Sequence, residues 1–499
     1  MYELKDKGID NNLAKSGKSL SQRVVRGGVW VFALRITERG FGLIRLVILA
    51  RILAPHDFGL MGIALLTMAT LGTFSQTGFH AALIQKKDNT DSYLNAAWTV
   101  LVLRGLFLFG ILFFIAPYAA IFFKAPQAKT IIQVIGFSVL LQAFTNIGVI
   151  YFQKELQFNK QLLYQLSGTL ADFAVAVSAA LILRSIWALV FGLLAGNVAR
   201  FIASYLIHPY RPHLSSDLGK AKELFGFGKW ILGSSILIFL ITQGDDIFVG
   251  KFLGTTMLGF YQMAYMISNM PATEITHVIS QVTFPAYSKL QDNLPKLREA
   301  YLRTLQFTAF LSFPIAGLIF VLAPDFTKIF LGEKWLPMVP AIQVLALWGF
   351  IRSIGATTGS VFQGIGKPGI ATKLQFVQLI LLAMLIYPLS IRWGILGTSL
   401  AVVVSALITN LISSYMVVKV TRCEIWNFSK MIVLPLINVA IMISPIFILK
   451  TYWVNSAGIL EFFLFIVLGI LIYFGLTCLL ERSLNYRIRS IIKESLASL

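Results

Sequence analysis

The chain has 499 residues, of which 57% are hydrophobic and 13% charged, so its apolar surface exceeds what a soluble globular fold can bury. Its net charge of +20 comes without a basic face or an aromatic-basic module, so nucleic acid is not an expected partner. Two cysteines are too few for a disulfide framework, and five scattered histidines lack metal-ligand spacing, so no metal site or cofactor is expected. These features predict an all-α polytopic membrane protein.

Hydrophobic runs long enough to cross a hydrocarbon core of about 30 Å predict about fourteen transmembrane helices. The fifth and sixth spans, and the eleventh and twelfth, are separated only by tight turns at Arg184–Ser185 and Arg392–Gly394. In chain order the predicted spans are 27–50, 58–79, 94–116, 131–152, 162–183, 186–207, 230–250, 258–284, 304–323, 338–362, 374–390, 395–418, 431–449 and 457–480.

An internal repeat relates the first six spans to the next six. A shift of 200 positions pairs Gly28 with Gly228, Trp30 with Trp230, Leu53 with Leu253 and Gly59 with Gly259. An even number of helices per repeat predicts two six-helix lobes of the same orientation, plus two C-terminal helices. The predicted divisions are an N-terminal tail (1–26), an N-lobe (27–207), a linker (208–229), a C-lobe (230–418), the last two helices with their preceding loop (419–480) and a C-terminal tail (481–499).

The distribution of lysine and arginine predicts the orientation. Alternate loops on the side that holds both termini carry roughly three times as many Lys and Arg residues as those on the other side. Cytoplasmic loops are enriched in positive charge, so both termini, and with them the tails and the linker, are expected in the cytoplasm of a bacterium. The protein is expected in the inner membrane.

Positive side chains inside predicted spans are candidate functional residues, because intramembrane charges are expensive and usually face protein or a water-filled cavity. The first span carries Arg35, Glu38, Arg39 and Arg45, and positions 35, 38 and 45 share one helical face. Arg35 and Glu38 could form a purely structural pair, but the surplus of arginine favours an anionic ligand such as a phosphate. Arg200 lies close enough to the cytoplasmic end of its span to reach the interface. The predicted substrate-binding set is Arg35, Arg39, Arg45, Arg104 and Arg352, the last two near mid-depth in the third and tenth spans.

Acidic residues inside spans are candidates for binding a coupling ion, H⁺ or Na⁺. The set comprises Glu38, Asp172, Asp245, Asp246 and Glu274. Asp245 lies at the repeat position of Arg45, so either the two lobes present opposite charges toward a shared cavity or these two residues pair. Both interpretations remain open at this point.

Several separated stretches resemble bacterial polysaccharide flippases, in particular the branch that includes colanic acid and teichuronic acid exporters. The similarity extends from about residue 27 to about residue 419, which is most of the chain. The matching stretches are Ala50–Leu60, Ala82–Lys87, Asp245–Gly250, Phe284–Gln291 and Leu331–Trp335 with Val339–Pro340.

This resemblance implies the multidrug/oligosaccharidyl-lipid/polysaccharide exporter fold, with two six-helix lobes and alternating access. It implies transport of an undecaprenyl-diphosphate-linked oligosaccharide from the cytoplasmic to the outer leaflet, driven by an ion gradient, with a polysaccharide polymerase and export machinery as further partners. By analogy with related lipid II flippases, the diphosphate would contact Arg35, Arg39 and Arg45, and the ion would contact Asp245 or Asp246.

Two other functions are weighed against this one. A drug or small-metabolite exporter of the same superfamily would take small cations, which the surplus of intramembrane arginine disfavours. A membrane-embedded polymerase or glycosyltransferase would carry a large outer loop or a soluble catalytic domain, and neither is evident. The adjacent carboxylates Asp245 and Asp246 lie within an apolar span, which also disfavours an enzyme.

Overall fold

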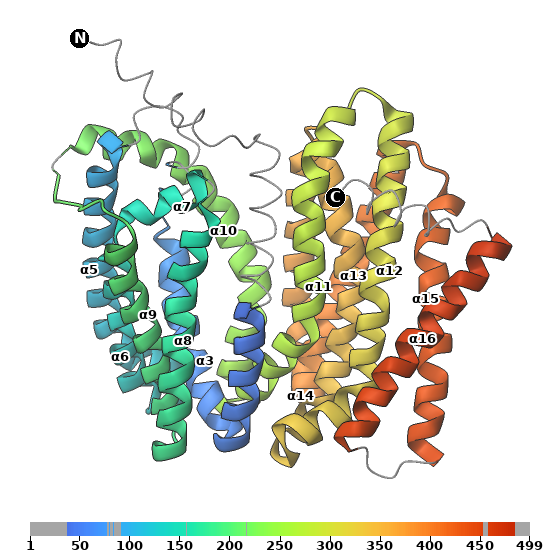
Figure 1. Ribbon diagram of the computed structural model, residues 1–499, viewed down its shortest axis with the longest axis horizontal. Coiled ribbons are helices and arrows are strands. Elements are labelled where there is room, and N and C mark those ends of the chain that lie inside the picture. Colours follow the sequence, from blue (N-terminus) through green and yellow to red (C-terminus); the bar gives the residue numbers. More distant parts are fainter. Residues whose placement is uncertain are drawn as a thin grey trace. The chain divides into compact units, whose positions relative to one another are not determined.

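The computed structural model describes residues 37–76, 91–155, 157–215, 217–452 and 458–484, together with Phe79 and Leu83. Throughout these ranges the chain forms helices and the turns that connect them, as predicted for an all-α protein (Figure 1). Residues 37–52 are helical up to Ile52, and the preceding part of the first predicted span lies outside the described residues. The long helices are α3 (Pro55–Phe74), α5 (Asp91–Phe122), α6 (Ala128–Ala143), α8 (Phe158–Leu183), α9 (Trp187–Ile207), α10 (Leu218–Phe252), α11 (Thr255–Leu290), α12 (Leu294–Phe326), α13 (Val339–Gly364), α14 (Pro368–Thr421), α15 (Ile425–Tyr452) and α16 (Ile459–Leu484). The short ones are η1 (Ile147–Val149), α7 (Ile150–Lys154), η2 (Thr327–Leu331) and η3 (Glu333–Met338).

Nine of the described helices are long and apolar enough to cross a membrane, and a bent pair raises the number to 10. The chain is therefore a multi-pass membrane protein, while the total of fourteen spans stays a prediction. The bent pair consists of α6 and the segment Ile147–Lys154, which meet at 70° where a single straight fourth span was predicted. Asn146 stabilises the break: its side chain accepts a hydrogen bond from the Gly148 amide at 2.9 Å and donates one to the Tyr210 carbonyl at 2.6 Å.

Both predicted tight turns are confirmed. Arg184 adopts a left-handed conformation (φ 45°) after α8, and α9 begins at Trp187. The helix α14 contains a kink at Gly394, whose φ of 60° and ψ of −138° are readily adopted only by glycine. The predicted eleventh and twelfth spans are thus the two halves of α14, before and after this kink.

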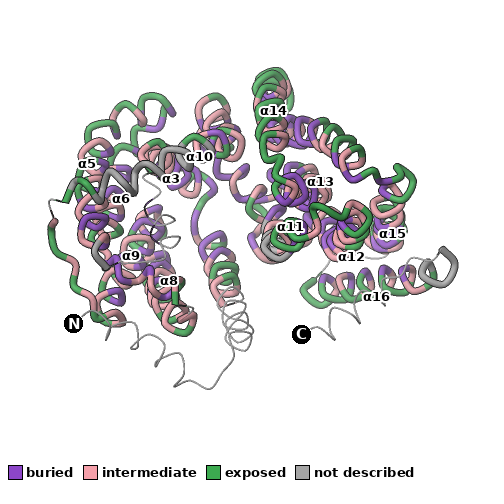
Figure 2. Tube along the Cα trace, turned by 90° about the horizontal axis from the view of Figure 1, so that it is seen from above, coloured by how far each residue is buried: buried purple, intermediate pink, exposed green. Residues whose placement is uncertain are grey.

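The described chain forms two compact units. The described residues of the first unit fall within 1–52, 67–117 and 129–233, and those of the second fall within 53–66, 118–128 and 234–499. In the second unit α13 packs against α11, α12 and α14, and Figure 2 shows it carrying mostly buried residues, whereas α16 has a broad exposed side. Two buried clusters form the core of this unit, one around Phe313 and Met442 and one around Tyr301 and Phe362.

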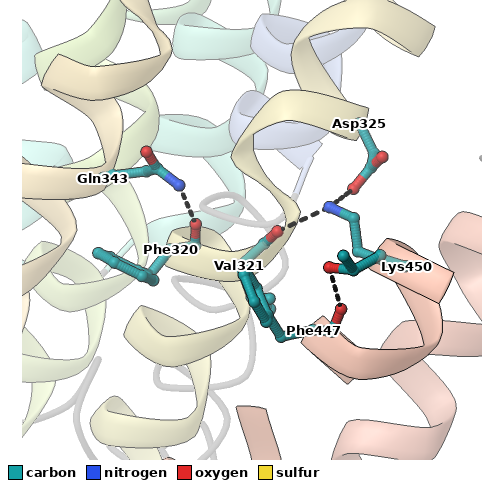
Figure 3. A network of polar contacts seen from close by, with 7 residues as sticks. Phe320, Val321, Asp325, Gln343, Phe447 and Lys450 are labelled. Atoms are coloured by element: carbon teal, nitrogen blue, oxygen red, sulfur yellow. Dashed lines mark hydrogen bonds and ion pairs between the residues drawn. The ribbon is translucent and has the colours of Figure 1, made fainter. Parts of the chain in front are cut away.

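A polar network inside the second unit joins α12 to α13 and α15 (Figure 3). Pro324 has no amide hydrogen, so the Phe320 carbonyl four residues earlier lacks its helical donor. The Gln343 side chain donates to that carbonyl at 3.1 Å. Lys450 donates to the adjacent Val321 carbonyl at 2.9 Å and forms an ion pair with Asp325, with side chains 17% and 12% exposed. Gln343 thus replaces the one helical hydrogen bond that Pro324 removes from α12, and Lys450 fixes α15 against the same turn.

Candidate functional site

The first helix brings Arg45 to an acid on another span. Arg45 Nη2 lies 3.0 Å from Asp172 Oδ1 on α8, so one predicted cation and one predicted ion-binding acid form an ion pair. Asp172 is therefore the partner that the structure gives Arg45 within the first unit. Glu38 and Arg39 lie on the same helix, with Arg39 exposed, whereas Arg35 lies outside the described residues.

Arg200 on α9 joins this pair, which sequence reasoning missed. The charges of both Arg45 and Arg200 act on Asp172. The Arg200 side chain lies against Gly168 of α8, where a Cβ would come 2.8 Å from its Cζ. The Nε atoms of both arginines are buried and have no hydrogen-bond partner among the residues that the structure describes. Two guanidinium groups and one carboxylate therefore leave this cluster with a surplus positive charge and unused donors, which suits an anionic ligand.

Arg104 binds the end of a neighbouring helix. Its Nε donates to the Ser75 carbonyl at 2.7 Å, and its Nη2 donates to the Gly72 carbonyl at 2.9 Å and to Ser75 Oγ at 3.0 Å. These acceptors lie at the C-terminal end of α3, where carbonyl groups lack helical donors. The guanidinium thus caps α3 and holds it against α5.

The adjacent acids Asp245 and Asp246 lie on α10 in different surroundings. Asp245 is buried, accepts a hydrogen bond from the Tyr261 hydroxyl at 2.6 Å and another from the Asp246 amide at 3.0 Å. Asp246 Oδ1 is buried with no hydrogen-bond partner among the described residues. A carboxylate with an unused buried oxygen suits a proton or a small cation. Glu274 lies on α11, but its side chain is outside the described part of the chain.

Arg352 lines a cavity of about 620 Å³ within the second unit. Its guanidinium lies 4.9 Å from the centre of the Trp348 ring, in a cation–π arrangement. Most other polar lining residues are hydroxyl or amide side chains that sequence analysis did not single out, because uncharged polar residues are common in membrane helices. The polar residues that share this lining are Thr273, Thr276, Ser280, Ser360, Gln363, Gln375, Gln378, Thr409, Asn410 and Ser413.

The predicted site residues are thus distributed over separate local environments. Arg45 and Asp172 meet in the first unit, Asp245 and Asp246 lie together on α10, and Arg352 faces the cavity of the second unit. Within the part of the chain that the structure describes, no cluster of three metal-ligating side chains occurs.

Comparisons with known proteins supply an independent line of evidence. The family model described as "Polysaccharide biosynthesis protein" matches residues 48–340. The chain is 26% identical over 403 residues to the lipopolysaccharide biosynthesis protein WzxC of Escherichia coli, covering 80% of this chain and 82% of the relative. It is 26% identical over 368 residues to the teichuronic acid biosynthesis protein TuaB of Bacillus subtilis, covering 73% and 76%.

A solved structure shows the same fold. The lipid II flippase MurJ, in an inward closed conformation, superposes with a TM-score of 0.72 at 15% identity, over 92% of this chain and 99% of that one. The described helices therefore adopt the fold of that transporter.

Proposed function

Because this chain belongs to the polysaccharide biosynthesis protein family, we propose that it is a flippase for undecaprenyl-diphosphate-linked oligosaccharide repeat units. It would move these units from the cytoplasmic to the outer leaflet for surface polysaccharide synthesis, as a transporter and not as an enzyme. The observation that carries this proposal is the cluster of Arg45, Arg200 and Asp172, which places surplus positive charge and unused donors among apolar helices.

The proposed architecture has fourteen spans in two six-helix lobes, residues 27–207 and 230–418, followed by two further helices. The prediction of cytoplasmic termini in the bacterial inner membrane belongs to this proposal, and the charge bias of the loops supports it. A polysaccharide polymerase and export machinery would receive the product. Alternating access by such a protein lets a polar head group cross while the lipid tail stays in hydrocarbon.

The chemistry assigns different roles to the charged residues. A diphosphate and several sugars would lose their hydration in hydrocarbon with nothing in exchange. Guanidinium groups of Arg45, Arg200 and Arg39, with that of Arg35 in the first predicted span, would replace that hydration at the diphosphate. Arg104 supports the site indirectly, because its donors hold the end of α3.

The acids of α10 are the proposed coupling-ion site. Asp246 Oδ1 is buried and has no hydrogen-bond partner in the described part of the chain, and Asp245 is oriented by the Tyr261 hydroxyl. Protonation or Na⁺ binding would satisfy the unused oxygen and lower the cost of keeping the carboxylates out of water. Glu38 and Glu274 stay candidates for binding the same ion, whereas Asp172 already forms an ion pair with Arg45.

A drug or small-metabolite exporter is the second candidate function, since such transporters belong to the same superfamily. The surplus positive charge beside Asp172 disfavours cationic substrates, because like charges repel. A polymerase or glycosyltransferase has no observation in its favour.

The test is leaflet exchange in proteoliposomes. The probe is a fluorescent undecaprenyl-diphosphate oligosaccharide, and its exchange is followed by accessibility to a membrane-impermeant quencher, with and without proton or sodium gradients. We expect gradient-dependent exchange that falls in Arg200→Gln, Arg39→Ala and Asp246→Asn. The matched control is Arg303→Gln, since Arg303 forms an exposed pair with Glu299 and should tolerate the change.

One result would contradict the flippase function, and another would contradict the roles proposed for the charged residues. If wild-type protein moves no lipid-linked sugar but expels small amphiphiles, the drug-exporter function replaces it. If exchange is normal in all three variants and in the control, the flippase function stands but the assignment of the charged residues is wrong. Membrane insertion of each variant is measured in parallel, so that lost exchange is not mistaken for lost protein.

A further inference from the structure

The cavity of the second unit is formed by three helices and shaped by one backbone kink. It is lined by α11, α13 and α14, and the kink at Gly394 folds the two halves of α14 so that residues far apart in sequence line the same space. We propose that this cavity binds the sugar part of the transported lipid, and that it takes uncharged, hydroxyl-rich sugar units. This inference rests on the proposed flippase function.

The lining offers hydrogen-bonding groups of the kind that recognise sugar hydroxyls. Gln375 and Gln378 are three residues apart on the first half of α14 and share a helical face, while Thr409 and Asn410 come from the second half. Across the described residues, no protein group forms a hydrogen bond with the amides of Gln375 or Gln378. Each primary amide has two donors and one acceptor, and a sugar hydroxyl can both donate and accept. These two amides are therefore available to a ligand.

The charge of the cavity favours a sugar as its ligand over a cationic drug or the diphosphate. Arg352 is the one charged residue among the described lining residues, and no carboxylate is among them. A cationic drug would meet repulsion, and a diphosphate would find one guanidinium where it needs several donors. The Trp348 ring beside Arg352 adds an apolar face of the kind that packs against the C–H groups of a sugar.

The size and location of the cavity agree with this ligand. A volume of about 620 Å³ lies in the range of pockets that hold small ligands. Lining hydroxyls such as Thr409 Oγ1 donate to carbonyl groups of their own helix. The amides of Gln375 and Gln378 have no such partner among the described residues, and an amide is costly in hydrocarbon unless water or a polar ligand pairs with it. Gly359 on α13 also borders the cavity, and a Cβ at this position would meet no atom of the described residues within 4 Å. A larger side chain at position 359 can thus extend into the cavity, because its Cβ does not overlap a described protein atom.

The experiment compares binding of two lipids to purified protein in detergent. One probe is radiolabelled undecaprenyl diphosphate, and the other is the same lipid carrying a neutral disaccharide, in gluco- and galacto-configured forms. The measured quantity is the ratio of their dissociation constants. Two net hydrogen bonds predict about tenfold tighter binding of a glycosylated probe to the wild type. The ratio should fall to about one in Gln375→Leu/Gln378→Leu and in Gly359→Leu, and stay at the wild-type value in Gly359→Ala.

The outcomes separate this inference from the proposed function. Equal affinity of the wild type for bare and glycosylated lipid would overturn the sugar site while leaving the diphosphate-binding function intact. An unchanged ratio in both the Gln375→Leu/Gln378→Leu and the Gly359→Leu variants would also overturn it. Failure of the wild type to bind any of these lipids would contradict the flippase function itself. The melting temperature of each variant in the same detergent establishes that it is folded, and retained binding of bare undecaprenyl diphosphate does so independently.

Discussion

Substituting Gly59 by alanine should destabilise the protein, because two helix starts meet there with no room for a side chain. Gly59 lies near the start of α3, and a Cβ added to it would overlap the backbone carbonyl oxygen of Thr255, the first residue of α11. The contact is reciprocal: a Cβ on Gly259 would overlap the Pro55 carbonyl oxygen at the start of α3. Both contacts lie within the second unit, and they involve residues that the internal repeat pairs with each other.

The size of the effect follows from two opposing contributions. Replacing glycine by alanine within a helix ordinarily stabilises by about 0.5–1 kcal/mol, because glycine loses more backbone entropy on folding. Overlap in a packed interior costs about 1–3 kcal/mol, and here the obstructing atoms are backbone, so the helices themselves must separate. Overlap should exceed the entropic gain, and Gly59→Ala should unfold at a lower temperature than the wild type.

Two other glycines provide a graded comparison. At Gly62, on the same helix, the three atoms nearest an added Cβ all belong to the side-chain amide of Gln262, which can shift more easily than backbone. At Gly110 in α5 it would meet nothing within 4 Å. Apparent melting temperatures of the purified variants in one detergent should therefore rise in the order Gly59→Ala, Gly62→Ala, Gly110→Ala. If Gly59→Ala melts at or above Gly110→Ala, the close packing of α3 against α11, and the reasoning built on it, is wrong.

Three further predictions concern buried polar groups. Asp172→Asn leaves Arg45 without its anion and should lower the melting temperature. The double variant Asp172→Asn/Arg45→Gln should recover part of that loss, because it removes the unpaired cation. If the losses of the two single variants simply add in the double variant, the two residues are not coupled. Lys450→Met leaves Asp325 buried without its cation and should cost about 3–5 kcal/mol, whereas Lys450→Met with Asp325→Leu should approach wild-type stability in the same melts. Burial raises the pKa of the thiol of Cys423, which lies two residues beyond the end of α14. Because the thiolate is the reactive form, maleimide labelling of Cys423 as sole cysteine should still accelerate above about pH 8.5, and a plateau below that pH would contradict it.

Composition and pattern were enough to predict the class of this protein and several of its turns. Long apolar runs require a membrane environment regardless of how the helices pack, because a soluble fold cannot bury so much apolar surface. In lipid these runs must be helical, because the backbone has to satisfy its hydrogen bonds within each segment. The turns at Arg184 and Gly394 were predictable for a similar reason, since the apolar runs on either side leave only a few residues for the connection. The bend of 70° between α6 and Ile147–Lys154 was missed. It depends on a bond from Asn146 to Tyr210, a residue distant in sequence.

The sequence by itself determined that charged residues occupy particular apolar helices, because the position of each residue within a hydrophobic run can be read directly from the sequence. Only the tertiary structure decided what those charges contact. Arg45 is paired with Asp172, Arg104 caps α3, and Arg352 faces a cavity among uncharged side chains. These differences arise from the rotation and packing of helices that are far apart in sequence. Lipid-facing and protein-facing sides of a membrane helix are both apolar, so hydrophobic periodicity gives little information about either.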